Sequence, residues 1–205
     1  MNSHQLSFSM TVRKYFLDHP MEVILLVMYL LLWKTVPGFL TVDNQLNVLR
    51  NIAVTGIIAA GMTLVIISGE IDLSIASLVA AAGCLCAWVV QYLTPVDDIE
   101  PAVWMVMVGI VSAMGFGLFI GFCTGWLRQH VGVPSFITTL AMMAILVGFA
   151  NLITNGTPIE SYPNWFGMIG SGRWLGVPVP VYIFGLVVGI MHVISRYTAF
   201  GRDVY

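Results

Sequence analysis

The sequence predicts an all-α membrane protein, a polytopic helical bundle of about six transmembrane helices. Of the 205 residues, 59% are hydrophobic and 9% are charged, whereas soluble domains carry about 25% charged residues. A soluble fold of this length cannot cover so much apolar surface with polar groups. The apolar segments are long and do not alternate with polar residues, which argues against the strands of a membrane β-barrel.

Charged residues divide the chain into six apolar segments. The first covers about residues 21–40, and the second lies between Arg50 and Glu70. The other four cover about residues 73–94, 102–127, 136–154 and 177–194. Each approaches the roughly 20 residues that cross about 30 Å of hydrocarbon. We therefore expect an N-terminal cytoplasmic segment, residues 1–20, followed by a transmembrane domain, residues 21–205.

The distribution of Lys and Arg predicts a cytoplasmic N-terminus, because cytoplasmic loops are enriched in these residues. The inner side then carries Arg13, Lys14, Arg128, Arg196 and Arg202. The outer side carries Arg173, with Lys34 and Arg50 near outer helix ends, and an acidic loop with Asp97, Asp98 and Glu100. The bias is modest but favours this orientation.

Composition and motifs argue against several classes of function. Cys84, Cys86 and Cys123 lie within apolar runs, are too few for a disulfide framework and lack the spacing of a zinc site. The net charge of -2 and the lack of a basic cluster give no indication of nucleic-acid binding. We find no phosphate-binding loop, no His-Glu-x-x-His motif and no nucleophile elbow, so we expect no catalytic residues and no metal site.

Two carboxylates, Glu70 and Asp72, interrupt a long apolar stretch at residues 68–77. Carboxylates within lipid are costly, so they face water, a partner or a cavity. In one geometry, residues 69–72 form a tight cytoplasmic turn, with Asp72 near the N-cap of the next helix and Glu70 solvated. In the other, the helix breaks within the membrane and lines a cavity. Hydropathy favours the turn. The second geometry makes four residues candidates for a translocation path: Glu70, Asp72, Ser74 and Ser77.

Four glycines form a stripe in the fourth span. Gly117, Gly121 and Gly125 are four residues apart, and Gly115 is nearby. This spacing puts three of them on one helix face, which lets another helix approach closely. We interpret the stripe as a packing surface.

Polar residues also occur in the fifth span. Pro134 suits the beginning of a helix, where its missing N–H costs nothing. Thr138 and Thr139 cap the helix, hydrogen-bond their own backbone, or face a polar pathway, and the first two, structural interpretations are favoured. Asn151 is a further candidate for the pathway in the same span.

Four blocks of sequence, taken in order, resemble one known family. They are residues 51–67 continued by Gly69-Glu70-Ile71-Asp72-Leu73-Ser74, the glycine-rich fourth span, Val133-Pro134-Ser135-Phe136-Ile137-Thr138-Thr139-Leu140, and Thr198-Ala199-Phe200-Gly201-Arg202. Together they resemble the permease subunits of ribose/xylose/arabinose-type ABC sugar importers, and the match covers nearly all residues from about Val42 onward.

The sequence departs from the family pattern at two points. The family commonly reads Gly-Gly-Ile-Asp-Leu-Ser-Val-Gly, whereas Glu70 and Ala76 replace two of the glycines, as in the arabinose-type branch. Such permeases also have more helices, and a segment after Gly201-Arg202 contacts the ATPase. The chain ends at Tyr205, so we expect a permease truncated at its C-terminus, with Gly201 and Arg202 as candidates for cytoplasmic coupling.

The resemblance implies a multi-pass protein of the bacterial inner membrane that moves a monosaccharide, a pentose or similar sugar. Its implied partners are an ATP-binding-cassette ATPase subunit, a periplasmic sugar-binding protein, a second permease copy and the lipid bilayer. The ATPase hydrolyses ATP, so the permease needs no cofactor and is not an enzyme. Two alternatives stay open: an ion-coupled secondary transporter that uses Glu70 and Asp72, and a non-functional truncated remnant.

Overall fold

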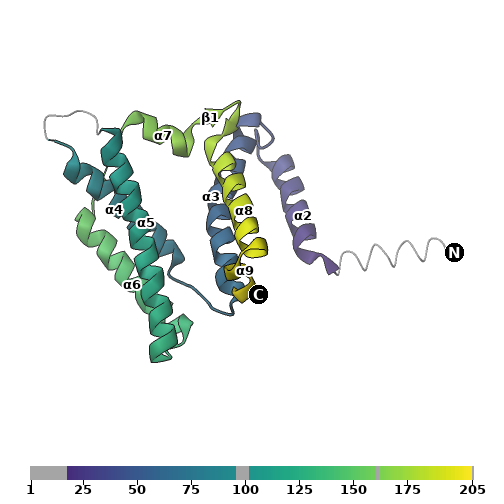
Figure 1. Cartoon of the computed structure of the whole chain (residues 1–205). Coiled ribbons are helices and arrows are strands. Elements are labelled where there is room, and N and C mark those ends of the chain that lie inside the picture. Colours follow the sequence, from purple (N-terminus) through teal and green to yellow (C-terminus); the bar gives the residue numbers. More distant parts are fainter. Residues whose placement is uncertain (1–17, 96–101, 160–161, 205) are drawn as a thin grey trace, which may run out of the picture. The chain divides into compact units, whose positions relative to one another are not determined.

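The computed structural model describes residues 18–95, 102–159 and 162–204, most of them in helices (Figure 1). The chain divides into two units, Met1–Leu49 and Arg50–Tyr205, and each is described by itself. Several charged residues that carry the predicted orientation lie outside the described residues: Arg13, Lys14, Asp97, Asp98 and Glu100.

Helix α2 (Pro20–Thr35) occupies the first unit. Proline in its first turn suits a helix start, because the first N–H groups have no partner within the helix. The predicted first segment extended to about residue 40, but the helix ends at Thr35. Pro37 disfavours helical backbone at the residue before it, and Gly38 adopts a left-handed φ of 79°. At about 1.5 Å per residue, the 16 residues of α2 span about 24 Å.

Five helices among the described residues are long and apolar enough to cross a membrane. They are α3 (Val42–Ile67), α4 (Ile75–Leu93), α5 (Val103–Trp126) with the π-helical turn η1 (Leu127–Val131), α6 (Ser135–Thr154) and α8 (Val179–Tyr197). The polytopic helical architecture predicted from the sequence is therefore confirmed. Their bounds lie within three residues of those predicted, except that α3 begins well before Arg50 and η1 extends the fourth span to Val131. A charged residue near a membrane surface does not end a helix, because its long side chain can reach water.

Short elements join and follow these helices. Helix α7 (Asn164–Ser171) precedes a hairpin of β1 (Arg173–Trp174) and β2 (Val177–Pro178). The strands are antiparallel, with Trp174 opposite Val177. Helix α9 (Ala199–Val204) follows α8.

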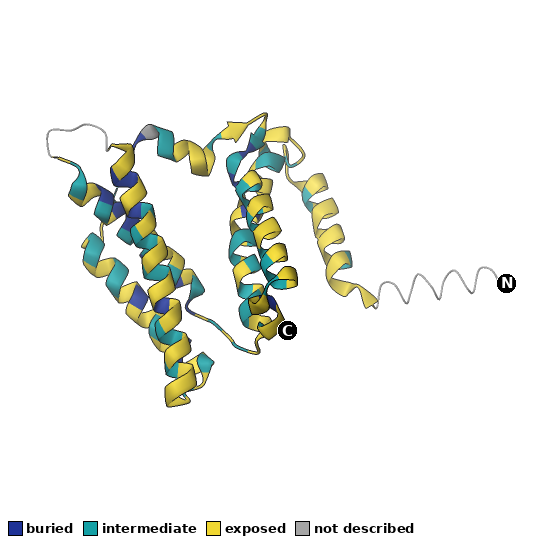
Figure 2. Cartoon of the chain, in the orientation of Figure 1, coloured by how far each residue is buried: buried dark blue, intermediate teal, exposed yellow. Residues whose placement is uncertain are grey.

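Helix α4 packs against both α5 and α6 and forms the best-buried part of the second unit. Ala81, Val90, Val106 and Leu146 are at most 1% exposed. Gly109 of α5 permits a close approach to α4, because a Cβ atom there would lie 2.8 Å from Val90 Cγ2 and 3.0 Å from the Cys86 carbonyl oxygen. Much of the remaining helix surface is exposed (Figure 2) and apolar, as expected for helices that face lipid.

Candidate functional site

The site begins at a non-helical segment between α3 and α4, residues 68–74, which we call the linking segment. Helix α3 ends in a Schellman motif, in which the Gly69 N–H donates to the Ile66 carbonyl and the Glu70 N–H donates to the Val65 carbonyl. Gly69 has a φ of 78°, which favours glycine at this position. The predicted turn of residues 69–72 is thus too short, because α4 begins three residues later, at Ile75.

Asp72 organises the entry into α4. Its Oδ1 accepts hydrogen bonds from the Ser74 N–H at 2.7 Å and from Ser74 Oγ at 2.6 Å. Ser74 is the N-cap residue of α4 and is 1% exposed. The Ser77 hydroxyl donates to the Ser74 carbonyl at 2.7 Å. Asp72 therefore precedes the helix, as the turn geometry predicted, and its carboxylate bonds to the N-cap residue itself.

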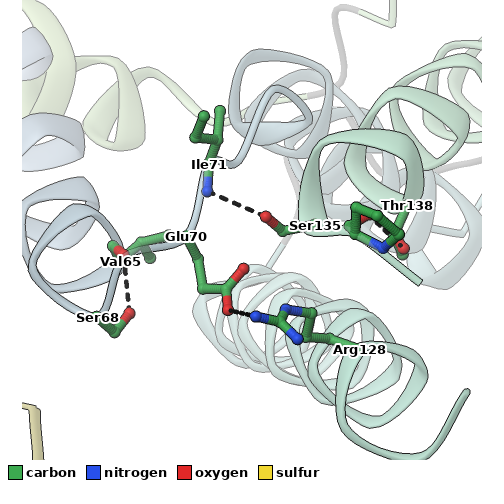
Figure 3. Close-up of polar contacts among 8 residues, drawn as sticks. Val65, Ser68, Glu70, Ile71, Arg128, Ser135 and Thr138 are labelled. Atoms are coloured by element: carbon green, nitrogen blue, oxygen red, sulfur yellow. Dashed lines mark hydrogen bonds and ion pairs between the residues drawn. The ribbon is translucent and has the colours of Figure 1, made fainter. Parts of the chain in front are cut away.

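Glu70 forms an ion pair with Arg128, with 2.8 Å between Glu70 Oε1 and Arg128 Nη2 (Figure 3). Arg128 lies in η1, directly after α5. The Glu70 side chain is 27% exposed, so it keeps contact with solvent while α5 and the beginning of α6 lie beside it. Two hydrogen bonds hold the pKa of Glu70 below its usual value because they stabilise the carboxylate. The bond from Arg128 has the larger effect, and the bond from Ser135 the smaller.

The peptide groups of Ile71 are held by the first turn of α6. The Ile71 N–H donates to Ser135 Oγ at 3.3 Å (Figure 3). Thr139 Oγ1 lies 3.2 Å from the Ile71 carbonyl oxygen and closer, 2.8 Å, to the Ser135 carbonyl oxygen of its own helix, so these two carbonyls share its one O–H donor. Thr138 Oγ1 bonds to the Pro134 carbonyl at 3.3 Å. The structure thus places both predicted threonines beside the linking segment, where they bond mainly to backbone.

A cavity of about 270 Å³ lies between the linking segment and the facing ends of α5 and α6. Its polar wall includes Glu70, Asp72, Arg128, Thr138 and Thr139. Four of these five residues are predicted pathway candidates that lie up to 69 positions apart in the sequence. We call this space the polar cavity.

Two stripe glycines, Gly121 and Gly125, complete the wall of the polar cavity. A Cβ atom built on either would meet nothing within 4 Å, and the same holds for Gly115 and Gly117. Within the described chain, no helix packs closely against these four glycines. Their role in packing against another helix stays a prediction.

The other candidates lie apart from the polar cavity. Ser74 and Ser77 are buried behind Asp72. Asn151, near the other end of α6, lines a separate cavity of about 560 Å³ together with Tyr162. Gly201 is buried where α8 meets α9, and a Cβ atom there would collide with the carbonyl oxygens of Ser195 and Ile194. Arg202 is exposed on α9.

The sequence reasoning did not identify Arg128 and Ser135 as members of the site. The predicted spans already indicated that Arg128 could lie near Glu70. Successive spans cross in opposite directions, so the ends of the second and fourth spans lie on one side. These two ends carry charges of opposite sign, those of Glu70 and Arg128.

The family model and the relatives described below are all named as transport permeases. The family model "Branched-chain amino acid transport system / permease component" matches residues 44–205. The ribose import permease protein RbsC of Escherichia coli (strain K12) is 35% identical over 202 residues, covering 94% of this chain and 60% of that protein.

Two further relatives are also named as sugar permease proteins. The L-arabinose ABC transporter permease protein AraH of Azospirillum brasilense is 33% identical over 184 residues, or 89% of this chain and 51% of that protein. The xylose transport system permease protein XylH of Escherichia coli (strain K12) is 36% identical over 148 residues, which cover 72% of this chain and 35% of that protein. The chain thus spans 60% or less of the length of these relatives. No solved structure shows a significant match.

Proposed function

Because the chain belongs to the permease-component family of the branched-chain amino acid transport system, we propose that it is part of the membrane permease of an ABC importer for a monosaccharide, a pentose or similar sugar. The observation that carries this proposal is the similarity, over 94% of the chain, to a ribose import permease protein. The names of the arabinose and xylose relatives support the same class of solute.

The polar cavity supports a role in solute passage. Carboxylate, guanidinium and hydroxyl groups lie together between helices that are otherwise apolar. Polar and ionisable groups at such places in membrane proteins commonly mark a substrate or ion pathway. We assign Glu70, Asp72, Thr138 and Thr139 to the pathway. Ser74 and Ser77 support Asp72, and Asn151 belongs to a separate part of the pathway.

The proposed assembly follows from the family. The permease lies in the bacterial inner membrane with its N-terminus in the cytoplasm and pairs with a second copy. An ATP-binding-cassette ATPase binds on the cytoplasmic side, where Gly201 and Arg202 contribute to coupling. A periplasmic sugar-binding protein delivers the solute. Chemical energy comes from ATP hydrolysis by the ATPase subunit, so the permease itself carries no catalytic residue.

The test is uptake of radiolabelled ribose, L-arabinose and xylose by cells in which the gene is intact, disrupted, or disrupted and restored on a plasmid. We expect disruption to abolish high-affinity uptake of at least one of these sugars, and the plasmid copy to restore it. Disruption of the neighbouring ATPase gene should have the same effect.

Two outcomes would contradict the proposal. Unchanged uptake of all three sugars would exclude this class of solute. Uptake that survives loss of the ATPase but collapses with the H⁺ or Na⁺ gradient would favour an ion-coupled transporter that uses Glu70 and Asp72.

A further inference from the structure

We propose that Arg128 is a positioning residue that, through its ion pair with Glu70, holds the linking segment over the polar cavity and thereby controls access to the cavity. The geometric part of this inference is independent of transport. Its consequence for a neutral, polyhydroxylated solute rests on the proposed function.

The linking segment is fixed at both ends by hydrogen bonds to residues close in the sequence. The Schellman motif of α3 fixes the segment as far as the Glu70 N–H. The bonds from Ser74 to Asp72 fix it from residue 72 onward. Between these points lie the Glu70 side chain and the peptide groups of Ile71, and their contacts come from α5 and α6.

These middle contacts come from two separate helix ends. Ser135 and Thr139 are four residues apart and therefore share one face of α6. Ser135 accepts from the Ile71 N–H, and Thr139 Oγ1 lies within hydrogen-bond distance of the Ile71 carbonyl while also bonding to the Ser135 carbonyl of its own helix. The guanidinium of Arg128, from the end of α5, binds the carboxylate of Glu70. Three side chains thus hold two consecutive residues, and Arg128 supplies the charged contact.

The burial of these side chains indicates which contact opens most readily. Arg128 is 50% exposed and Glu70 is 27% exposed, whereas Thr138 and Thr139 are 7% and 5% exposed. The ion pair therefore lies at the exposed edge of the polar cavity, and the threonines lie at its buried end. An ion pair with this much exposure is weak, because water screens the charges, so it can open without unfolding the helices.

The experiment measures access to the cavity directly, on the purified chain in lipid nanodiscs. The three native cysteines are replaced (Cys84→Ala, Cys86→Ala and Cys123→Ala), and Thr138→Cys supplies a reporter at the buried end. The reporter reacts with a charged, membrane-impermeant maleimide. Arg128→Gln should raise the labelling rate about fivefold, because loss of this weak, exposed ion pair lets the linking segment open more often.

Two variants separate positioning from general loosening of the fold. Arg128→Lys retains the charge and should keep the slow rate. Arg196→Gln removes an exposed arginine from the end of α8 and should leave the rate unchanged. If the Thr138→Cys chain does not fold, Gly125→Cys replaces it, because the space for its side chain is open.

The inference is overturned if Arg128→Gln labels at the parental rate with the working reporter, or if Arg196→Gln accelerates labelling equally. The labelling assay contains no sugar and no ATPase. Accelerated labelling in a protein that transports none of the tested sugars would therefore retain the positioning role and refute the proposed function.

Discussion

The close crossing of α4 and α5 provides the sharpest test of the packing. A Cβ atom at Gly109 would lie 2.8 Å from Val90 Cγ2 and 3.1 Å from Cys86 Sγ. Two of these neighbours are side chains at the best-buried part of the second unit, with Val90 fully buried and Cys86 6% exposed. The third, the Cys86 carbonyl oxygen at 3.0 Å, belongs to the backbone of α4 and can move only with its helix. We therefore expect Gly109→Ala to separate α4 from α5.

The magnitude follows from the opposing effects of the added methyl group. Overpacking of a well-packed contact costs about 1–3 kcal/mol, while alanine in place of glycine within a helix gains about 1 kcal/mol. The matched control is Gly115→Ala in the same helix, where nothing lies within 4 Å of the added Cβ. The control receives the helix gain without the packing cost. The two variants should thus differ by about 1–3 kcal/mol in the free energy of unfolding, with Gly109→Ala the less stable.

Thermal unfolding in a mild detergent, followed by tryptophan fluorescence, measures this difference. A difference of 1 kcal/mol corresponds to about 2–4 °C in Tm for a chain of this size. The reasoning is refuted if the two variants melt at the same temperature, or if Gly109→Ala melts higher. Either result would mean that α4 and α5 do not approach as closely as the structure places them.

Three further predictions concern the linking segment and the topology. Asp72→Ala should lower the free energy of unfolding by about 1–3 kcal/mol because it removes the acceptor of the buried Ser74 N–H, whereas Asp72→Asn keeps an acceptor and should cost less; equal melting temperatures for the two variants would contradict this role. The lowered pKa of Glu70 means that its ion pair stabilises the fold above the ordinary carboxyl pKa and loses this effect as the pH falls through the lowered value. The difference in Tm between the parent and Glu70→Gln should therefore be constant from pH 7 to about pH 5 and vanish at lower pH; a difference that persists in acid would exclude the charge as its cause. Single cysteines at positions 98 and 170 should react with an impermeant reagent from the periplasm and those at 129 and 200 from the cytoplasm, and labelling of position 98 solely from the cytoplasm would reverse the proposed orientation.

The five long helices were predictable because their signal is local. A run of about 20 apolar residues must satisfy its own backbone hydrogen bonds in lipid, so composition and length alone indicate a helix. The predicted bounds of two helices, α2 and α3, differed from the observed ones. The predicted first segment extended to about residue 40, but Pro37 and Gly38 end α2 earlier. Helix α3 begins at Val42, before Arg50. The charge of Arg50 shows that this part of the helix is near the membrane surface, but it does not show where the helix begins.

The residues of the candidate site were predictable as separate polar interruptions of apolar segments, because each one is costly in lipid and therefore conspicuous. Glu70 and Asp72 were identified in this way, whereas for Thr138 and Thr139 bonding to their own backbone was favoured and the pathway was the alternative. Their convergence on one cavity was not, because the packing of α4 against α5 and α6 brings the segments together. Gly121 and Gly125 illustrate the limit: four-residue spacing predicts one helix face, but it does not say whether that face meets a helix or an open cavity.

By itself, the sequence determined a polytopic helical membrane protein and its resemblance to sugar-importer permeases, since both depend on patterns within continuous stretches of the chain. The tertiary structure alone decided that Arg128 pairs with Glu70, that Ser135 and Thr139 hold Ile71, and that Asn151 lies in a different cavity. The physical reason is that each of these facts depends on distances between residues separated by tens of positions. Helix packing sets those distances, and no local pattern of charge or hydropathy encodes them.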